Sequence, residues 1–436
     1  MSTDTKTSLF DANYIDAYAS RRGEPQWFVE LRKKGLAEVE NLPMPKAEKT
    51  RTIGWNFTTF DHETPSEPLT STESLPQKVQ QLIGKGDQSG NLLIHHNGNG
   101  VYSTLSEELK SKGVIFTDLK TAIQNHGELL EKFYFGKACS FSENQLTARN
   151  AALVNAGTFV YVPKNVSVDV PLQSVYWQEN PTAGLINHVV LVAETGSSVT
   201  FVENYLSEDG EGSGVANVIS EVYVGDNARV QYGAVDALAK NVTTYLNRRA
   251  YVGRDGKVEW ALGQMNDGDT ISETFTKLVG DGSVGDTKAV SIGRGEQKQN
   301  FTNYIQHIGK NTESKLLIHG VQREGANAIF NGITKIEHGG TKSNGDQTQR
   351  VLMLSDKARG DANPILLIDE DDVVAGHAAS VGRIDPIQLF YLKSRGISEK
   401  EAERLVIHGF LAPVVTKLPV EGVKEQLIEV IEGKVK

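Results

Sequence analysis

The feature that most limits how this chain can fold is a degenerate internal repeat, which begins near Ala151. Short runs rich in β-forming residues, such as His188–Glu194, alternate from there with turns of Gly, Asn and Asp. Taken as equivalent positions in successive repeats, Val199, Val230 and Val258 lie 31 and 28 residues apart. A β-containing period of this length is typical of solenoids and propellers. Two short strands per period favour the coils of a parallel β-helix, and an antiparallel sandwich of hairpins remains the alternative.

Helical patterns flank the repeat and divide the chain into three expected parts. Residues 1–145 are mixed and largely helical, residues 146–384 form the β core, and residues 385–436 are helical again. In the first part, apolar spacing predicts helices at Gln26–Asn41 and Asp118–Phe133. A solenoid leaves two open ends, and we expect other elements to cover them.

Capping signals predict three helices after the repeat. Asp385-Pro386 begins the first, which stops at Gly396, a residue suited to the position after a helix. Ser398 caps the second, which we expect to end near Gly409. Apolar residues along one face predict a last helix over about residues 422–433.

The charge balance restricts the partners of the chain. Its 436 residues include 45 Lys and Arg against 55 Asp and Glu, so the net charge is −10. An acidic protein is poorly suited to nucleic acid or anionic membranes, and we expect neither as a partner. Met1–Phe10 lacks the features of a secretory signal, and no apolar run approaches the ~20 residues of a membrane helix. We therefore expect a soluble cytoplasmic protein.

Motifs that carry chemistry are scarce. The single cysteine, Cys139, excludes an intrachain disulfide and any metal site or cluster held by several of this chain's own thiolates. Its Phe-rich surroundings predict a small buried thiol. No P-loop or GxSxG elbow occurs, and the GxGxxG match at Gly280–Gly285 precedes an expected strand, which indicates a turn. The pair His95-His96 stands in a Gly/Asn-rich segment and is expected in an exposed loop.

His377 differs from the other late histidines in its context. It follows the acidic run Asp369–Asp372 and lies among the small residues of Ala375–Ser380, which leave room for another chain or a ligand. The residues alone leave two interpretations open. One is a solvated acidic turn with a bystander histidine, and the other is a binding position.

A longer segment carries a family resemblance. Val351–Val415 contains LMLSDKARGDANPILLIDEDDVVAGHAASVGRID and then LFYLKSRGISEKEAERLVIHGF. It resembles the SufB/SufD family of iron–sulfur cluster assembly scaffolds, and within the family it is more similar to the SufD branch. The resemblance implies a mainly β protein, a right-handed parallel β-helix between helical terminal regions, which decides against the sandwich.

The resemblance also implies two protein partners in the cytoplasm. A Cys-bearing SufB-like paralogue would pair through the β-helix ends, and a SufC-like ABC ATPase would dock on the C-terminal helical region. The expected function is that of a non-enzymatic scaffold subunit. An isolated chain is also expected to form a homodimer through an exposed solenoid end. The alternatives are a β-helix carbohydrate-active enzyme and a purely structural partner with no cluster ligand.

The family resemblance gives His377 a candidate role. It looks like the histidine that SufD-like proteins place near the paralogue interface, and imidazole can ligate iron. We expect His377 to be a candidate ligand that completes a nascent cluster site, with the other ligands from the partner. Some family members carry a cysteine where this chain has Ala375. The chain alone is therefore expected to bind no cofactor, and only a transient iron–sulfur cluster is shared with the partner.

The resemblance places the ATPase-docking surface on the first C-terminal helix and the turn that follows. The expected residues are Leu389, Phe390, Tyr391, Leu392, Arg395, Gly396 and Ile397. Two of these leucines, Leu389 and Leu392, could instead pack against the last helix while Phe390 or Tyr391 faces outward.

Overall fold

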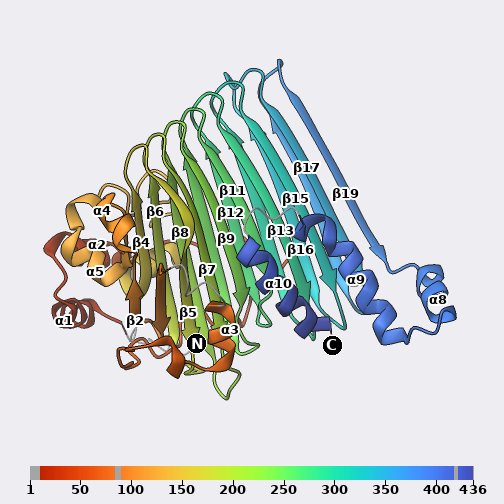
Figure 1. Ribbon diagram of the computed structural model, residues 1–436, viewed down its shortest axis with the longest axis horizontal. Coiled ribbons are helices and arrows are strands. Elements are labelled where there is room, and N and C mark those ends of the chain that lie inside the picture. The colour runs from red at the N-terminus through yellow and green to blue at the C-terminus, as the bar shows by residue number, and fades with distance from the viewer. Residues whose placement is uncertain (1–9, 84–89, 417–420, 436) are drawn as a thin grey trace, which may run out of the picture.

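Two β-sheets, stacked face to face, form most of the molecule in the computed structural model (Figure 1). The structure describes residues 10–83, 90–416 and 421–435, so nearly all of the N-terminal segment searched for a secretory signal lies outside it. The first sheet has ten strands, in the spatial order β19 (Val374–Arg383), β17 (Asn344–Met353), β15 (Glu313–Gln322), β13 (Val284–Gly293), β11 (Lys257–Gln264), β9 (Arg229–Ala237), β7 (Ser198–Ser207), β5 (Ser167–Gln178), β1 (Leu92–His96) and β2 (Asn99–Thr104). The second has nine, in the order β18 (Arg359–Ile368), β16 (Asn327–Ile336), β14 (Lys298–His307), β12 (Thr270–Leu278), β10 (Val242–Val252), β8 (Gly214–Val224), β6 (Gly184–Ala193), β4 (Ala156–Val162) and β3 (Ile115–Asp118).

The chain alternates between the two sheets, so each turn of the coil adds one strand to each sheet. From β4 to β19 this makes about eight turns of a parallel β-solenoid. Val199, Val230 and Val258 are direct register partners in three successive strands of the ten-stranded sheet. The predicted repeat and the mainly β parallel-helix fold with helical regions at both ends are therefore confirmed.

Apolar side chains fill the space between the sheets because successive residues of a strand point to opposite faces. Aromatic rings of successive turns contact each other in this interior: Tyr176 stacks on Tyr205, and Tyr232 lies tilted against Trp260, with ring centroids 4.8 Å apart in both pairs. All four side chains are fully buried. Burial of one large apolar side chain contributes roughly 1.5–3 kcal/mol, so these stacks are a main source of the solenoid's stability.

A buried ion cluster interrupts the apolar interior. The Arg248 guanidinium donates to Glu203 Oε1 at 3.0 Å and to Asp236 Oδ1 at 2.6 Å, and all three side chains are inaccessible to solvent. Burial alone would lower the pKa of Arg248, but the charges of Asp236 and Glu203 outweigh it and raise that pKa above its usual value. The Tyr232 hydroxyl donates to the other Glu203 oxygen at 2.7 Å. The cluster therefore keeps its charges only as a complete set.

Helices cover the flanks and the N-terminal end of the solenoid. Those before the core lie mainly on the outer face of the nine-stranded sheet, whereas α9 and α10 lie across the ten-stranded sheet (Figure 1). The helices are α1 (Ala12–Arg22), α2 (Gln26–Glu38), the 3-10 turn η1 (Thr72–Ser74), α3 (Gln77–Ile83), α4 (Glu107–Ser111), α5 (Leu119–Asn125), α6 (Gly127–Leu130), α7 (Gln145–Leu153), α8 (Pro386–Ser394), α9 (Glu399–Val415) and α10 (Glu421–Val435).

The two ends of the solenoid differ, and the expectation that both are covered is wrong. At the N-terminal end, β2 and β3 add antiparallel strands to the sheets. At the other end, β18 and β19 are the last strands of their sheets among the described residues. The C-terminal helices do not cap this end because their apolar faces pack on the side of the ten-stranded sheet instead.

Three local predictions need correction. The prediction that His95-His96 lies in an exposed loop is wrong, because both histidines belong to β1. Asn97 and Gly98 alone make the turn, with positive φ values of 46° and 84°. His95 is only 1% exposed. The helix expected at Asp118–Phe133 is two short helices, α5 and α6. The helix that Ser398 caps does not end near Gly409, since its buried apolar face continues to Val415.

The buried ion cluster predicts an asymmetric response to mutation. Arg248→Met leaves Glu203 and Asp236 as uncompensated buried carboxylates, and we expect it to lower the free energy of unfolding by about 3–5 kcal/mol. Urea unfolding followed by circular dichroism measures the change. Arg254→Met is the control, because Arg254 is 63% exposed and its removal is expected to cost no more than about 0.5 kcal/mol. Equal losses from the two variants would contradict the assignment.

A buried histidine predicts how stability depends on pH. His307 is fully buried between the Thr312 and Ser314 hydroxyls, at 2.7 and 2.8 Å, and burial lowers its pKa to about 4. The unfolded chain binds this proton near pH 6.5, so the stability that neutral His307 supplies is present above pH 6.5 and is lost as the pH falls towards 4.

Between pH 7 and pH 5, we expect the free energy of unfolding to fall by about 2 kcal/mol less in His307→Gln than in the wild type. Urea unfolding at the two pH values measures the difference, with exposed His338→Gln as the matched control. The same pH dependence in His307→Gln and wild type would show that His307 is not the buried neutral group.

Candidate functional site

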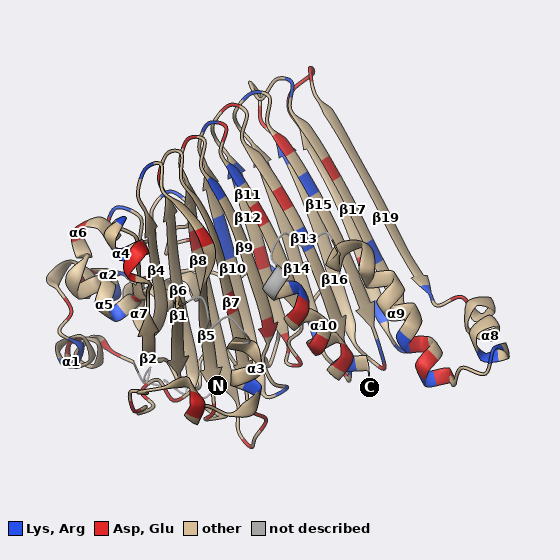
Figure 2. Cartoon of the chain, in the orientation of Figure 1, with Lys and Arg blue, Asp and Glu red and all other residues tan. Residues whose placement is uncertain are grey.

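The uncovered last turn of the solenoid is the largest unpartnered feature near His377. Val374 and Val381 on β19 and Leu367 on β18 are 67%, 42% and 44% exposed. β19 has no charged side chain before its last residue, Arg383, and appears as a neutral strand in Figure 2. Edge strands of soluble proteins are usually guarded by charges, proline or bulges. Pro364 partly guards β18, but β19 has no such protection, so its backbone is free to pair with another strand.

The backbone direction of β19 shows which groups are available. Val374 N–H donates to Ser343 at 2.9 Å and Ile384 N–H donates to Met353, so amides of even-numbered residues face β17. Amide directions alternate along a strand, and those of Ala375, His377 and Ala379 therefore point to the open side. These groups can form a ladder with an added strand.

His377 lies on the interior side of this last turn. Its register partner on β17 is Gln347, which is fully buried, and four register pairs further along the strand Val381 lies opposite the core residue Val351. The His377 side chain thus shares the face that fills the solenoid elsewhere. It is exposed because no further turn lies over it in the part of the chain that the structure describes. A partner that extends the solenoid would enclose this imidazole.

No complete metal site accompanies His377. Nowhere in residues 10–83, 90–416 and 421–435 do three His, Cys, Asp or Glu side chains come together around a metal-sized space. Cys139 is buried in the N-terminal half, as predicted, and burial raises the pKa of its thiol, so it is not available as a thiolate. Any metal or cluster at His377 needs ligands from another chain.

A second exposed feature is α8, which projects beyond β19 (Figure 1). Asp385 caps its first turn by accepting from Ile387 N–H at 2.8 Å, and Gly396 ends it with a φ of 85°. Apolar side chains cover its outer face, with Phe390 72% and Tyr391 57% exposed. The Arg395 guanidinium lies 5.2 Å from the centre of the Tyr391 ring. This surface has the aromatic and arginine content of many protein-binding hot spots.

The structure divides the seven residues predicted for this surface. Leu389, Leu392 and Ile397 are half-buried, whereas Phe390, Tyr391, Arg395 and Gly396 are exposed. Helix α8 packs mainly against α9 rather than against the last helix, α10. Docking of the ATPase on the exposed residues stays a prediction. Ile387, 75% exposed, was missed although its spacing of three and four residues from Phe390 and Tyr391 marks one helix face.

The remaining C-terminal helices fix the base of α8 to the solenoid. Ile407, Leu411 and Val414 of α9 pack on outward-facing residues of the ten-stranded sheet, and Val423 and Leu427 of α10 continue that contact. His319 of β15 contacts the Phe410 carbonyl of α9 through Nδ1 at 2.7 Å. A rigid support thus holds α9, and α8 extends from it.

These features define a class: a β-solenoid with an unguarded last turn and an apolar helix beside it. The model of the "SUF system FeS cluster assembly, SufBD core domain" matches residues 176–410, and that of the "SufBD protein N-terminal region" matches residues 89–174. The chain belongs to the SufB/SufD family.

Two relatives show how far this similarity extends. The chain is 57% identical to the iron–sulfur cluster assembly protein SufD of Bacillus subtilis (strain 168), over the full length of both chains. It is 27% identical to an iron–sulfur cluster assembly SufBD family protein of Staphylococcus aureus (strain USA300), over 94% of this chain and 90% of the relative. The predicted family and its SufD branch are confirmed.

Proposed function

We propose that this chain is a non-enzymatic scaffold subunit of the SUF system for iron–sulfur cluster assembly in the cytoplasm. The observation that carries the proposal is the unguarded last turn, which presents a free strand edge and one imidazole but no thiolate. Full-length similarity to a SufD supports the same role. No helix in the described residues is long and apolar enough to cross a membrane.

The first part of the proposal is pairing with a SufB-like paralogue through β19. The outward amides and carbonyls of β19 would continue the ten-stranded sheet into the partner. Apolar Val374 and Val381 would be buried in the same contact. Main-chain pairing supplies affinity and side-chain fit supplies specificity. An isolated chain has the same edge available, so it would form a homodimer when the paralogue is absent.

The second part concerns the cluster. His377 would lie inside the joined solenoids once the partner covers the last turn. There it would supply one neutral nitrogen ligand to a nascent cluster, and thiolates of the paralogue would supply the others. The cluster is cargo under assembly, and this chain retains none of it alone.

The third part is docking of a SufC-like ABC ATPase on α8. Phe390, Tyr391 and the newly found Ile387 would form the centre of the contact, with Arg395 beside them. Only the short segment Ile384-Asp385 separates α8 from β19, so movement of the docked ATPase would act directly on the strand that carries His377.

Two variants should separate the two interfaces. Ala379→Pro removes an outward amide of β19 without removing a bond to β17, so we expect it to abolish co-purification with the paralogue and to leave ATPase binding intact. Phe390→Asp places a charge in the α8 surface and should do the reverse, with a loss of at least about tenfold in ATPase affinity.

Ala379→Ser and exposed Lys393→Gln are the matched controls, one for each interface. Circular dichroism and melting temperature check that every variant is folded. If Ala379→Pro still pairs with the paralogue, β19 is not the interface. If Phe390→Asp still binds the ATPase, the α8 assignment is wrong.

A separate measurement tests His377 in the assembled complex. We expect His377→Ala to preserve the complex and to lower the affinity for the cluster about tenfold or more after anaerobic reconstitution. Iron and sulfide content and visible absorption report the cluster. His338→Ala, at an exposed histidine, is the control. Unchanged cluster content with an intact complex would leave this chain as a purely structural partner.

A further inference from the structure

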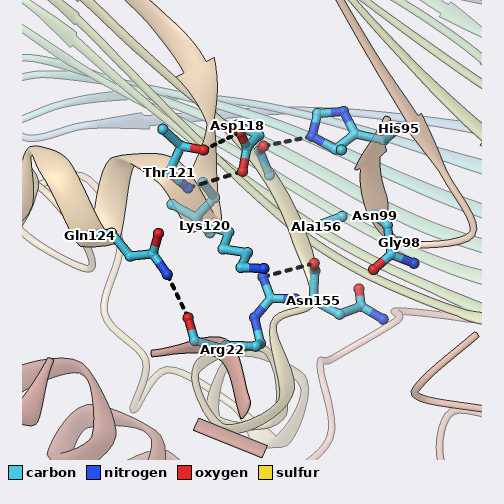
Figure 3. A pocket seen from close by; sticks show the side chains of 13 residues that line it. Arg22, His95, Gly98, Asn99, Asp118, Lys120, Thr121, Gln124, Asn155 and Ala156 are labelled. Atoms are coloured by element: carbon cyan, nitrogen blue, oxygen red, sulfur yellow. Dashed lines mark hydrogen bonds between the residues drawn. The ribbon is translucent and has the colours of Figure 1, made fainter. Parts of the chain in front are cut away.

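The N-terminal end of the solenoid contains a polar cleft that the proposed scaffold role does not use. Two neighbouring hollows of about 280 and 270 Å³ lie where the β1–β2 hairpin meets α1 and the start of α5. Both are lined by Arg22, Gly98, Asn99, Lys120 and Asn155, so the two hollows adjoin and are treated as one cleft, and Figure 3 shows the first of them.

Two cationic side chains line both hollows of this cleft. Both Arg22 and Lys120 line both hollows, and in Figure 3 the Lys120 side chain extends towards the Arg22 guanidinium. Lys120 forms no ion pair with any residue that the structure describes. Like charges placed together repel unless an anion lies between them.

The carboxylate that pairs with Arg22 does not neutralise the positive charge of the cleft. Glu24 lies 3.2 Å from Arg22 Nε, but its two oxygens also accept from buried Arg32 at 2.6 and 2.7 Å. One carboxylate therefore serves two guanidinium groups. The terminal nitrogens of Arg22 retain a single weak bond, from Nη2 to the Asn155 carbonyl at 3.4 Å.

The other side of the cleft accepts hydrogen bonds. Asp118 holds Thr121 through its amide at 3.0 Å and its hydroxyl at 2.6 Å, and its carboxylate lines the first hollow. His95 lines the same hollow at 1% exposure. Its Nε2 bonds the Gly157 carbonyl at 2.9 Å and its Nδ1 is inaccessible to solvent, so Asp118 rather than His95 is the acceptor that a ligand in the cleft can reach. A carboxylate acceptor suits the hydroxyl groups of a ligand.

We propose that this cleft binds a small hydroxylated molecule with one phosphate or carboxylate group. The anionic group would lie between Arg22 and Lys120, where charge-assisted hydrogen bonds are strongest, and hydroxyl groups would face the Asp118 carboxylate. The site is at the opposite end of the solenoid from β19 and does not depend on any protein partner.

Isothermal titration calorimetry on the full chain tests the proposal. The probes are glycerol 3-phosphate for the phosphate class, glycerate for the carboxylate class, and glycerol as the neutral control, all at constant ionic strength. We expect one of the two anions to bind and glycerol not to bind. Lys120→Gln should weaken binding at least about tenfold. Arg22→Lys keeps the positive charge but loses the bidentate geometry of the guanidinium, and it should weaken binding as well.

The matched control is Lys164→Gln, an exposed lysine outside the cleft, which should bind as the wild type does. Because Lys120 is exposed, its replacement is not expected to affect folding, and the melting temperature verifies this. The anion that binds identifies the class of ligand. Absence of binding by both anions at millimolar concentration, or equal binding by Lys120→Gln and wild type, would overturn the proposal.

Discussion

Parallel hydrogen bonding between each strand and the strand one full turn later is the constraint on which the rest of this structure depends. It fixes the register of successive turns, because a residue such as Val230 must lie directly over Val199 and under Val258. It also fixes which side chains meet inside, since register and pleat together stack Tyr176 on Tyr205. A ladder of this kind has no natural end. Each end of the coil must therefore be covered by other elements or remain available for pairing.

The two ends resolve this constraint in opposite ways. At the first end, antiparallel strands and helices complete the sheets, and a polar cleft lies among them. At the last end, β19 keeps its outward amides, and His377 occupies an interior position with nothing above it. In the proposed scaffold role, function depends on what joins this edge. The C-terminal helices leave the edge free because their apolar faces cover the side of the sheet.

The sequence patterns predicted most of the fold but only part of the candidate site. The spacing of Val199, Val230 and Val258 indicated coils because a solenoid repeats one local arrangement, which a single chain records in its own periodicity. His95 was misjudged because a Gly/Asn-rich segment does not show which two residues make the turn. The end of α9 was misjudged because Gly409 is tolerated in a helix whose buried face continues past it. Ile387 was missed, although its helical spacing from Phe390 was visible.

The sequence by itself determined the repeat, the family, the scarcity of thiolates and the candidate residues His377 and Phe390, because these depend on local pattern and composition. Only the tertiary structure decided which of them are accessible. It placed Arg248 between two buried carboxylates, left the outer edge of β19 unpaired among the described residues and brought Arg22 and Lys120 into one cleft. The sequence could not show these features because burial, an unpaired strand edge and the approach of two charges depend on residues that are far apart in the chain and close in space.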